Sequence, residues 1–215
     1  VLGARKLFAT GFALLAAGSL VAGLADSAGV EIVGRAVQGA AAALIAPAAL
    51  TMVMVLFSHD PGELTKAMGL YGAAAPVGGT AGVFLGGVLT QSLDWRFTLL
   101  INVPLAVVVL AATPRLLPGT VSRRGRIDVA GAATITTGLA LLVFGIVRAN
   151  IVGWGASQTL LSITGGITLI GVFVSIQAAR REPLMPLTIF RVPNLAAANV
   201  VIALLGAAWI PMWFI

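Results

Sequence analysis

The sequence predicts an all-helical membrane protein, a multi-pass bundle of transmembrane helices, and two observations carry this prediction. First, 59% of the 215 residues are hydrophobic and only 9% are charged, with a mean hydropathy of +1.06. A soluble domain has about a quarter of its residues charged, so this chain could not cover its surface against water. Second, its apolar stretches are long enough to cross a bilayer. We therefore expect lipid to surround most of the chain.

Seven apolar stretches reach or approach the roughly 20 residues that a helix needs to cross the hydrocarbon core. Most of them lack a polar stripe with a 3.6-residue period, which is typical of spans and not of helices on a soluble surface. The predicted spans are residues 7–25, 31–56, 67–90, 97–113, 128–148, 159–179 and 195–215.

The basic residues predict the orientation of these spans. If the gaps alternate between the two sides, ten of the 13 Lys and Arg residues fall on one side and two on the other, with Arg35 inside a span. The positive-inside rule makes the richer side cytoplasmic. The scatter of these residues among short gaps also argues against nucleic-acid binding, despite the net charge of +6. The cytoplasmic set is Arg5, Lys6, Lys66, Arg115, Arg123, Arg124, Arg126, Arg180, Arg181 and Arg191, and the outer set is Arg96 and Arg148.

Several connections show start and stop signals for helices. Asp60 followed by a proline predicts a helix start, and Asp128 predicts another, because a carboxylate suits the positive end of a helix. The proline-rich residues 182–194 cannot form one regular helix, and we expect a short amphipathic piece on the inner interface there, formed by Leu184, Met185, Leu187, Ile189 and Phe190. The chain starts at Val1 and ends inside an apolar run, so we expect an internal segment of a longer protein.

One ionisable residue lies within a predicted span. Arg35 shares a helix face with Gln38, three residues later, and Gly39 follows. A buried charge in a span is a functional-site hypothesis because its desolvation must be offset. The alternative is structural: Glu31 lies four residues earlier, in a favourable order for a helical ion pair, and the arginine could extend toward the interface. Both interpretations stay open on the sequence alone.

The third predicted span is rich in glycine. Gly78, Gly82 and Gly86 recur every four residues and form a smooth ridge, with Gly87 beside it, on which another helix can pack closely. Pro76 in the same span removes a backbone hydrogen bond and predicts a kink. Plain helix packing and a seam that seals or bends during transport are both compatible with this pattern.

The next outer gap and span hold a second group of polar residues and prolines. Trp95 and Arg96 precede the span, and Asn102 and Pro104 lie within it. Asn102 needs a hydrogen-bond partner in the membrane, and Pro104 leaves a carbonyl free.

The sequence contains no pattern that suggests catalysis. It has no cysteine, a single histidine (His59) in a polar turn, no Ser-His-Asp set, no metal-ligand cluster and no phosphate-binding loop. We therefore expect neither an enzyme nor a bound metal or cofactor. All seven acidic residues lie in gaps or at span ends. If the protein uses protons, we expect the titrating carboxylate elsewhere in the protein, or a partner from there that works with Arg35.

Four segments resemble, in order, motifs of the major facilitator superfamily, in particular its fourteen-helix drug:proton antiporter branch. LGARK at residues 2–6 resembles the end of the basic loop before helix three, and IVGRAVQG at 32–39 resembles the helix-four motif. The glycines at 78–87 resemble the helix-five antiporter motif, although Val83 replaces its usual proline. DWR at 94–96 with INVP at 101–104 resembles a signature of this branch.

The resemblance implies a domain organisation. Residues 1–113 would belong to the N-terminal bundle as helices three to six, and 114–127 would be a cytoplasmic basic loop. Residues 128–179 would be the extra central helix pair, helices seven and eight. Residues 180–215 would hold the interfacial segment and helix nine, the start of the C-terminal bundle.

The resemblance also implies a function. We expect a bacterial inner-membrane transporter that exports drug-like or other small organic compounds by alternating access, driven by the proton gradient without a cofactor. Arg35, Gln38 and Gly39 would assist proton coupling, the helix-five glycines would pack against neighbouring helices, and Arg5 and Lys6 would anchor helix three. The alternatives are a facilitator carrying a metabolite and, more distantly, a membrane-embedded protein that does not transport.

Overall fold

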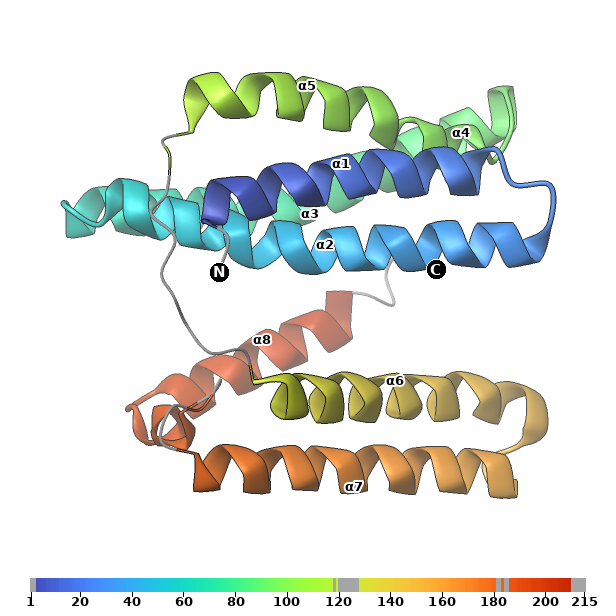
Figure 1. The fold of residues 1–215 in the computed structure, drawn as a ribbon, viewed down its shortest axis with the longest axis vertical. Helices are drawn as coiled ribbons and strands as arrows, with labels where there is room; N and C mark the ends of the chain where they lie inside the picture. The colour runs from blue at the N-terminus through green and yellow to red at the C-terminus, as the bar shows by residue number, and fades with distance from the viewer. Residues whose placement is uncertain (1–2, 118, 120–127, 181–182, 184–185, 210–215) are drawn as a thin grey trace. The chain divides into compact units, whose positions relative to one another are not determined.

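The computed structural model describes residues 3–117, 119, 128–180, 183 and 186–209 of the chain. Every regular element among these residues is helical (Figure 1), which confirms the predicted fold class. The chain divides into two compact units, Val1–Gly125 and Arg126–Ile215. Each unit is described by itself.

The first unit is built around a pair of antiparallel helices. Helix α1 (Ala4–Gly23) packs along α2 (Ala28–Phe57) on one side and contacts α5 (Asn102–Leu116) on the other (Figure 1). Helix α3 (Pro61–Ser92) contacts α2 and α4 (Phe97–Leu100), its neighbours in sequence, and none of its residues is buried. The core of this unit therefore lies along α1.

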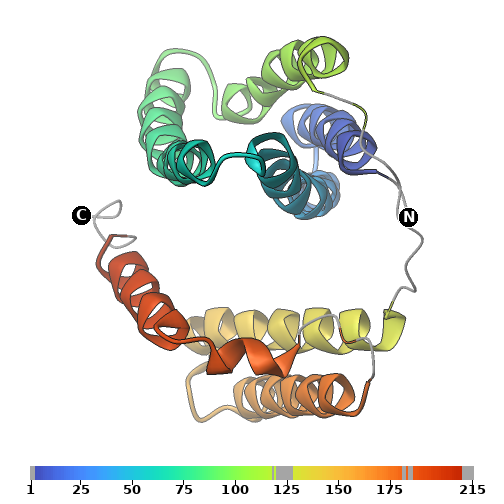
Figure 2. The ribbon, with the colours of Figure 1, turned by 90° about the vertical axis from the view of Figure 1, so that its left-hand side faces the viewer.

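The second unit is a helical hairpin followed by two shorter elements. Helices α6 (Val129–Val152) and α7 (Ser157–Ala179) lie side by side and antiparallel, as Figures 1 and 2 both show. A 3₁₀-helix η1 (Leu187–Arg191) leads into α8 (Leu195–Trp209). The predicted interfacial piece therefore contains a 3₁₀ turn at its end, whereas Leu184 and Met185 lie outside the described residues.

Within the part of the chain that the structure describes, six helical segments are long and apolar enough to cross a membrane. They correspond to the first six predicted spans, and the segment Phe97–Leu116 combines α4 and α5. The seventh prediction, 195–215, is described only as far as α8, because residues 210–215 lie outside the described part. Helices α2 and α3 contain 30 and 32 residues, so at 1.5 Å per residue both exceed the roughly 30 Å hydrocarbon core.

The predicted helix starts are confirmed by hydrogen bonds. The Asp60 carboxylate accepts from the backbone N–H groups of Gly62 (2.7 Å) and Glu63 (3.3 Å) at the start of α3. Asp128 accepts from the Gly131 N–H at 2.8 Å at the start of α6. In both cases a side-chain oxygen satisfies donors that the first turn of a helix leaves without an intrahelical partner.

The fourth predicted span, 97–113, is not one uninterrupted helix. It is divided at Ile101 into α4 and α5. Pro104 has no N–H to donate to the carbonyl four residues earlier, and the Asn102 amide donates to the Leu99 carbonyl at 3.1 Å. The proline therefore explains the interruption, and the asparagine finds the partner that a membrane environment requires.

Glycines allow close helix contacts in both units. On α6, a Cβ atom added to Gly138 would lie 3.1 Å from the Gly166 carbonyl oxygen, and one added to Gly166 on α7 would lie 2.8 Å from the Gly138 oxygen. Real Cβ atoms rarely come that close to backbone oxygens, so hydrogen is the only side chain that fits. This is the small-residue packing typical of helices in lipid.

Candidate functional site on helices α1 and α2

The close approach of α1 and α2 determines what the site can contain. A Cβ atom on Gly18 would lie 2.9 Å from the Gly34 oxygen, and one on Gly34 would lie 2.6 Å from the Ala22 nitrogen. The two backbones therefore touch over about one helical turn. Side chains at neighbouring positions on the two helices are brought within hydrogen-bond distance by this contact.

Ser19, Gln38 and Arg35 form a chain of hydrogen bonds at this contact. The Gln38 Nε2 group donates to Ser19 Oγ at 2.7 Å, and Arg35 Nη1 donates to Gln38 Oε1 at 3.0 Å. Ser19 is completely buried and Gln38 is 8% exposed. The structure thus brings two predicted site residues together and adds a third, on another helix, that the sequence interpretation missed. The presence of serine in an apolar run was the available signal.

The structural alternative for Arg35 has two parts, and the structure tests only the ion pair with Glu31; extension of the side chain toward the interface stays a prediction. Glu31 forms no ion pair with Arg35, since the described residues pair only as Lys66–Glu63, Arg96–Asp26 and Arg180–Asp128. Arg35 lies seven residues after the start of α2, about 10 Å along the helix at 1.5 Å per residue. Its guanidinium bonds to Gln38. The third predicted residue, Gly39, is exposed, and no atom lies within 4 Å of a Cβ added to it.

Arg96 connects two turns at the predicted outer end of the first unit. Its Nη2 group donates to the Ala25 carbonyl at 2.9 Å and lies 3.8 Å from Asp26, which is in the connection between α1 and α2. Its own backbone N–H donates to Asp94, and its guanidinium lies 5.8 Å from the centre of the Trp95 ring. The predicted signature residues therefore tie the α3–α4 turn to the α1–α2 turn.

A second polar cluster lies at the open end of the α6–α7 hairpin. The buried Asp128 carboxylate accepts from Gln177 Nε2 at 2.9 Å and pairs with Arg180 Nη2 at 2.9 Å. The pKa of Asp128 is held below its usual range by the Gly131 N–H and then by the Gln177 amide, with Arg180 helping and burial opposing. Sequence reasoning found Asp128 as a helix start but missed Gln177, because nothing local indicates a contact across 49 positions.

The remaining predicted residues lie apart from this site. Gly78, Gly82 and Gly87 on α3 have no atom within 4 Å of an added Cβ, and Gly86 meets only Thr98, at 3.9 Å. Apart from this one contact, the glycine ridge has no packing partner among the described residues, and its role as a seam stays a prediction. Arg5 and Lys6 lie in the first turn of α1, where anchoring likewise stays a prediction.

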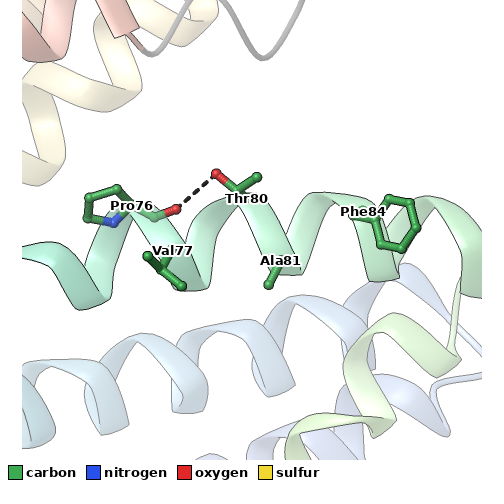
Figure 3. A pocket seen from close by; sticks show the side chains of 5 residues that line it. All are labelled: Pro76, Val77, Thr80, Ala81 and Phe84. Carbon is green, nitrogen blue, oxygen red and sulfur yellow. Dashed lines mark hydrogen bonds between the residues drawn. The ribbon is translucent and has the colours of Figure 1, made fainter.

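The same helix α3 carries a shallow hollow. It is lined by Pro76, Val77, Thr80, Ala81 and Phe84, all from α3, as Figure 3 shows. Thr80 Oγ1 donates to the Pro76 carbonyl at 3.0 Å, so the one hydroxyl in this lining is bonded within its own helix. Among the described residues, no group of three or more His, Cys, Asp or Glu side chains could hold a metal ion.

These features define a multi-pass helical membrane protein with a buried polar contact between two of its spans. The chain belongs to the Major Facilitator Superfamily, whose family model matches residues 1–215. The family and the fold therefore agree with the resemblance seen in the motifs.

Several curated relatives carry names that concern export or resistance. A cephamycin export protein of Amycolatopsis lactamdurans is 39% identical over 99% of this chain and 44% of its own length. A puromycin resistance protein of Streptomyces alboniger is 36% identical over 86% of this chain and 36% of its own length. A tetracenomycin C resistance and export protein of Streptomyces glaucescens is 32% identical over 97% of this chain and 39% of its own length. The chain thus spans about two-fifths of the length of these relatives.

Proposed function

We propose that the protein containing this chain is a proton-driven exporter of drug-like or other small organic compounds, working by alternating access in a bacterial inner membrane. The names of the relatives support export as the direction of transport. The observation that carries the proposal is the position of Arg35, a charged side chain oriented by Gln38 within an apolar span. The fourteen-helix antiporter branch and cytoplasmic basic loops are part of the same proposal.

The chemistry of arginine supports a role in proton coupling. A guanidinium stays protonated under all physiological conditions, so Arg35 cannot itself carry the proton. A fixed positive charge instead favours the ionised form of a carboxylate that approaches it. Alternating access would bring such a carboxylate toward Arg35 and away from it, which would make proton release and uptake depend on the conformation.

The cost of placing a charge in hydrocarbon argues against lipid as the working environment of Arg35. A charged side chain facing hydrocarbon costs about 2.5–3.5 kcal/mol on insertion scales, so such residues face a bundle interior or a water-filled cavity. Arg35 is exposed within the described residues. We infer that this exposed side of α2 faces the polar transport pathway or another part of the same protein.

The test uses the full-length protein in proteoliposomes with an imposed pH gradient. Puromycin, tetracenomycin C and a cephamycin are suitable probes because they appear in the names of the relatives. We expect gradient-driven accumulation by the wild type and its loss in Arg35→Ala, with membrane insertion intact. Arg115→Ala is the matched control, since Arg115 is exposed and bonds only to the Ala111 carbonyl of its own helix among the described contacts.

Three results would contradict the proposal or part of it. Wild-type protein that moves these probes without any dependence on the pH gradient would exclude proton-driven export. Unchanged accumulation by Arg35→Ala would remove Arg35 from the mechanism. A wild type that accumulates a metabolite but none of the antibiotic probes would favour the metabolite facilitator instead.

A further inference from the structure

We propose that Ser19 on α1 is a positioning residue for Arg35, acting through the side-chain amide of Gln38. This inference rests on the proposed proton-coupled function. Ser19 Oγ lies 2.7 Å from Gln38 Nε2, and Gln38 Oε1 lies 3.0 Å from Arg35 Nη1. The orientation of the functional guanidinium therefore depends on a hydroxyl group from a different helix.

The donor and acceptor chemistry allows one orientation of the amide. A guanidinium has only N–H donors, so it must face the oxygen of the Gln38 amide. The Nε2 group then points the opposite way and needs an acceptor, which the Ser19 oxygen supplies. With a carbon at that position, the amide nitrogen would be a buried donor without a partner, which is strongly unfavourable. The guanidinium therefore fixes which end of the amide it meets, and the Ser19 hydroxyl holds the amide in that orientation by satisfying the other end.

Because both side chains are buried, the orientation of the Gln38 amide depends closely on the Ser19 hydroxyl. Ser19 has no exposed surface and Gln38 is 8% exposed, so water is poorly placed to replace a missing hydroxyl. Without Ser19, the simplest way to satisfy the amide nitrogen is rotation of the Gln38 side chain toward the surface. That rotation takes Oε1 away from Arg35 and frees the guanidinium.

The polar pair is not needed to hold the helices together. Around it the contact is made by Gly18, Gly34 and Ala22, whose atoms already touch across the two backbones. Replacing both partners of a buried hydrogen bond by apolar groups of similar shape can be nearly neutral for stability. The Ser19–Gln38 bond therefore matters mainly for the orientation of Arg35. Through this bond, any shift of α1 along α2 would also change the position of the Arg35 charge.

The experiment compares two activities of the full-length protein in proteoliposomes. Accumulation of puromycin driven by a pH gradient requires proton coupling, whereas exchange of labelled for unlabelled puromycin without a gradient does not. For Ser19→Ala we expect gradient-driven accumulation to fall about tenfold, the effect of one buried hydrogen bond, with exchange unchanged. Gln38→Ala should show a similar fall. The double variant should fall no further than either single variant, because both changes break the same chain of bonds.

Two further variants separate positioning from folding. Thr113→Ala removes a buried hydroxyl from α5 that donates at 2.7 Å to the Val109 carbonyl of its own helix, and both activities should remain at the wild-type level. Ser19→Cys keeps the size of the side chain and a weak acceptor. It should recover part of the gradient-driven accumulation, and it decides the question if Ser19→Ala yields no folded protein.

The outcomes distinguish this inference from the proposed function. A wild type without gradient-driven accumulation refutes both. A coupled wild type with full accumulation in Ser19→Ala or Ser19→Ala/Gln38→Ala refutes the role of Ser19 alone. A double variant whose loss equals the product of the two single losses also refutes it, because the residues would then act independently.

Discussion

Replacing Gly34 with alanine tests the close contact of α1 and α2 on which the candidate site depends. The added Cβ would lie 2.6 Å from the Ala22 nitrogen, 2.7 Å from its Cβ and 2.9 Å from its Cα. Favourable contacts between such atoms lie at about 3.5–4.0 Å. All three atoms belong to the backbone or to a methyl group fixed to it, so no flexible side chain can move aside. The helices must separate locally by about 1 Å to restore favourable contacts.

The cost of this separation has two parts. Overpacking of a tight contact destabilises a protein by about 1–3 kcal/mol. A 1 Å separation would also stretch the Ser19–Gln38 bond from 2.7 Å to about 3.7 Å, beyond the limit for a hydrogen bond, at a further cost of about 1 kcal/mol. We therefore expect Gly34→Ala to lower the free energy of unfolding by about 2–4 kcal/mol in total and to weaken proton coupling.

Thermal unfolding of the purified full-length protein in detergent measures the first effect, and gradient-driven accumulation in proteoliposomes measures the second. Gly29→Ala is the matched control, since Gly29 lies on the same helix and an added Cβ there has its nearest neighbour, Ser27 Oγ, at 4.0 Å. Its unfolding temperature should not fall. A Gly34→Ala protein with unchanged unfolding temperature and transport would refute the close contact and the reasoning built on it.

Three further perturbations test other parts of the fold. Since its pKa is lowered on folding, ionised Asp128 stabilises the folded state fully above its unfolded-state pKa of about 4, and this contribution declines as pH falls through the lowered value. Asp128→Asn should therefore reduce thermal stability at pH 7, by an amount that shrinks as the pH is taken progressively below about 4, and a loss that grows on acidification would contradict it. Arg96→Ala should destabilise the full-length protein by about 1 kcal/mol in thermal unfolding, because the Ala25 carbonyl loses its donor; no loss would show that the contact is unimportant. Gly166→Ala should lower the unfolding temperature through overpacking. Gly171→Ala is the control and should not lower it, because nothing lies within 4 Å of the added Cβ. Equal effects of the two substitutions would contradict the packing of the hairpin.

The helical character of the chain and the positions of six membrane-length segments among the described residues could be predicted because they depend on local properties. A run of about 20 apolar residues satisfies its own backbone hydrogen bonds as a helix and meets lipid on every side. Helix starts are local in the same way: Asp60 accepts hydrogen bonds from residues two and three positions later. The division of the fourth span at Ile101 could also have been predicted, since Pro104 lacks the N–H that a continuous helix needs.

The choice among glycines could not be predicted from their spacing. The regular ridge Gly78, Gly82 and Gly86 is the most conspicuous pattern in the sequence, yet it has almost no neighbours among the described residues. The less regular pairs Gly18–Gly34 and Gly138–Gly166 instead make close backbone contacts between helices. Spacing shows which residues share a face of a helix, but the partner of that face depends on how distant segments come together.

Three features of this protein follow from local properties of its sequence. Hydrophobicity indicates lipid surroundings, helix-start signals indicate where helices begin, and a charge inside an apolar run marks Arg35 as a candidate site residue. Each of these properties depends on a few neighbouring residues. The hydrogen-bond partners of these side chains, in contrast, depend on how distant helices pack. In the folded chain Arg35 bonds to Gln38 and not to Glu31. Gln38 bonds to Ser19, which lies 19 positions earlier, and Asp128 bonds to Gln177 across 49 positions. Such contacts form where two backbones pack closely enough for short side chains to meet, and that closeness is a property of the folded helices together.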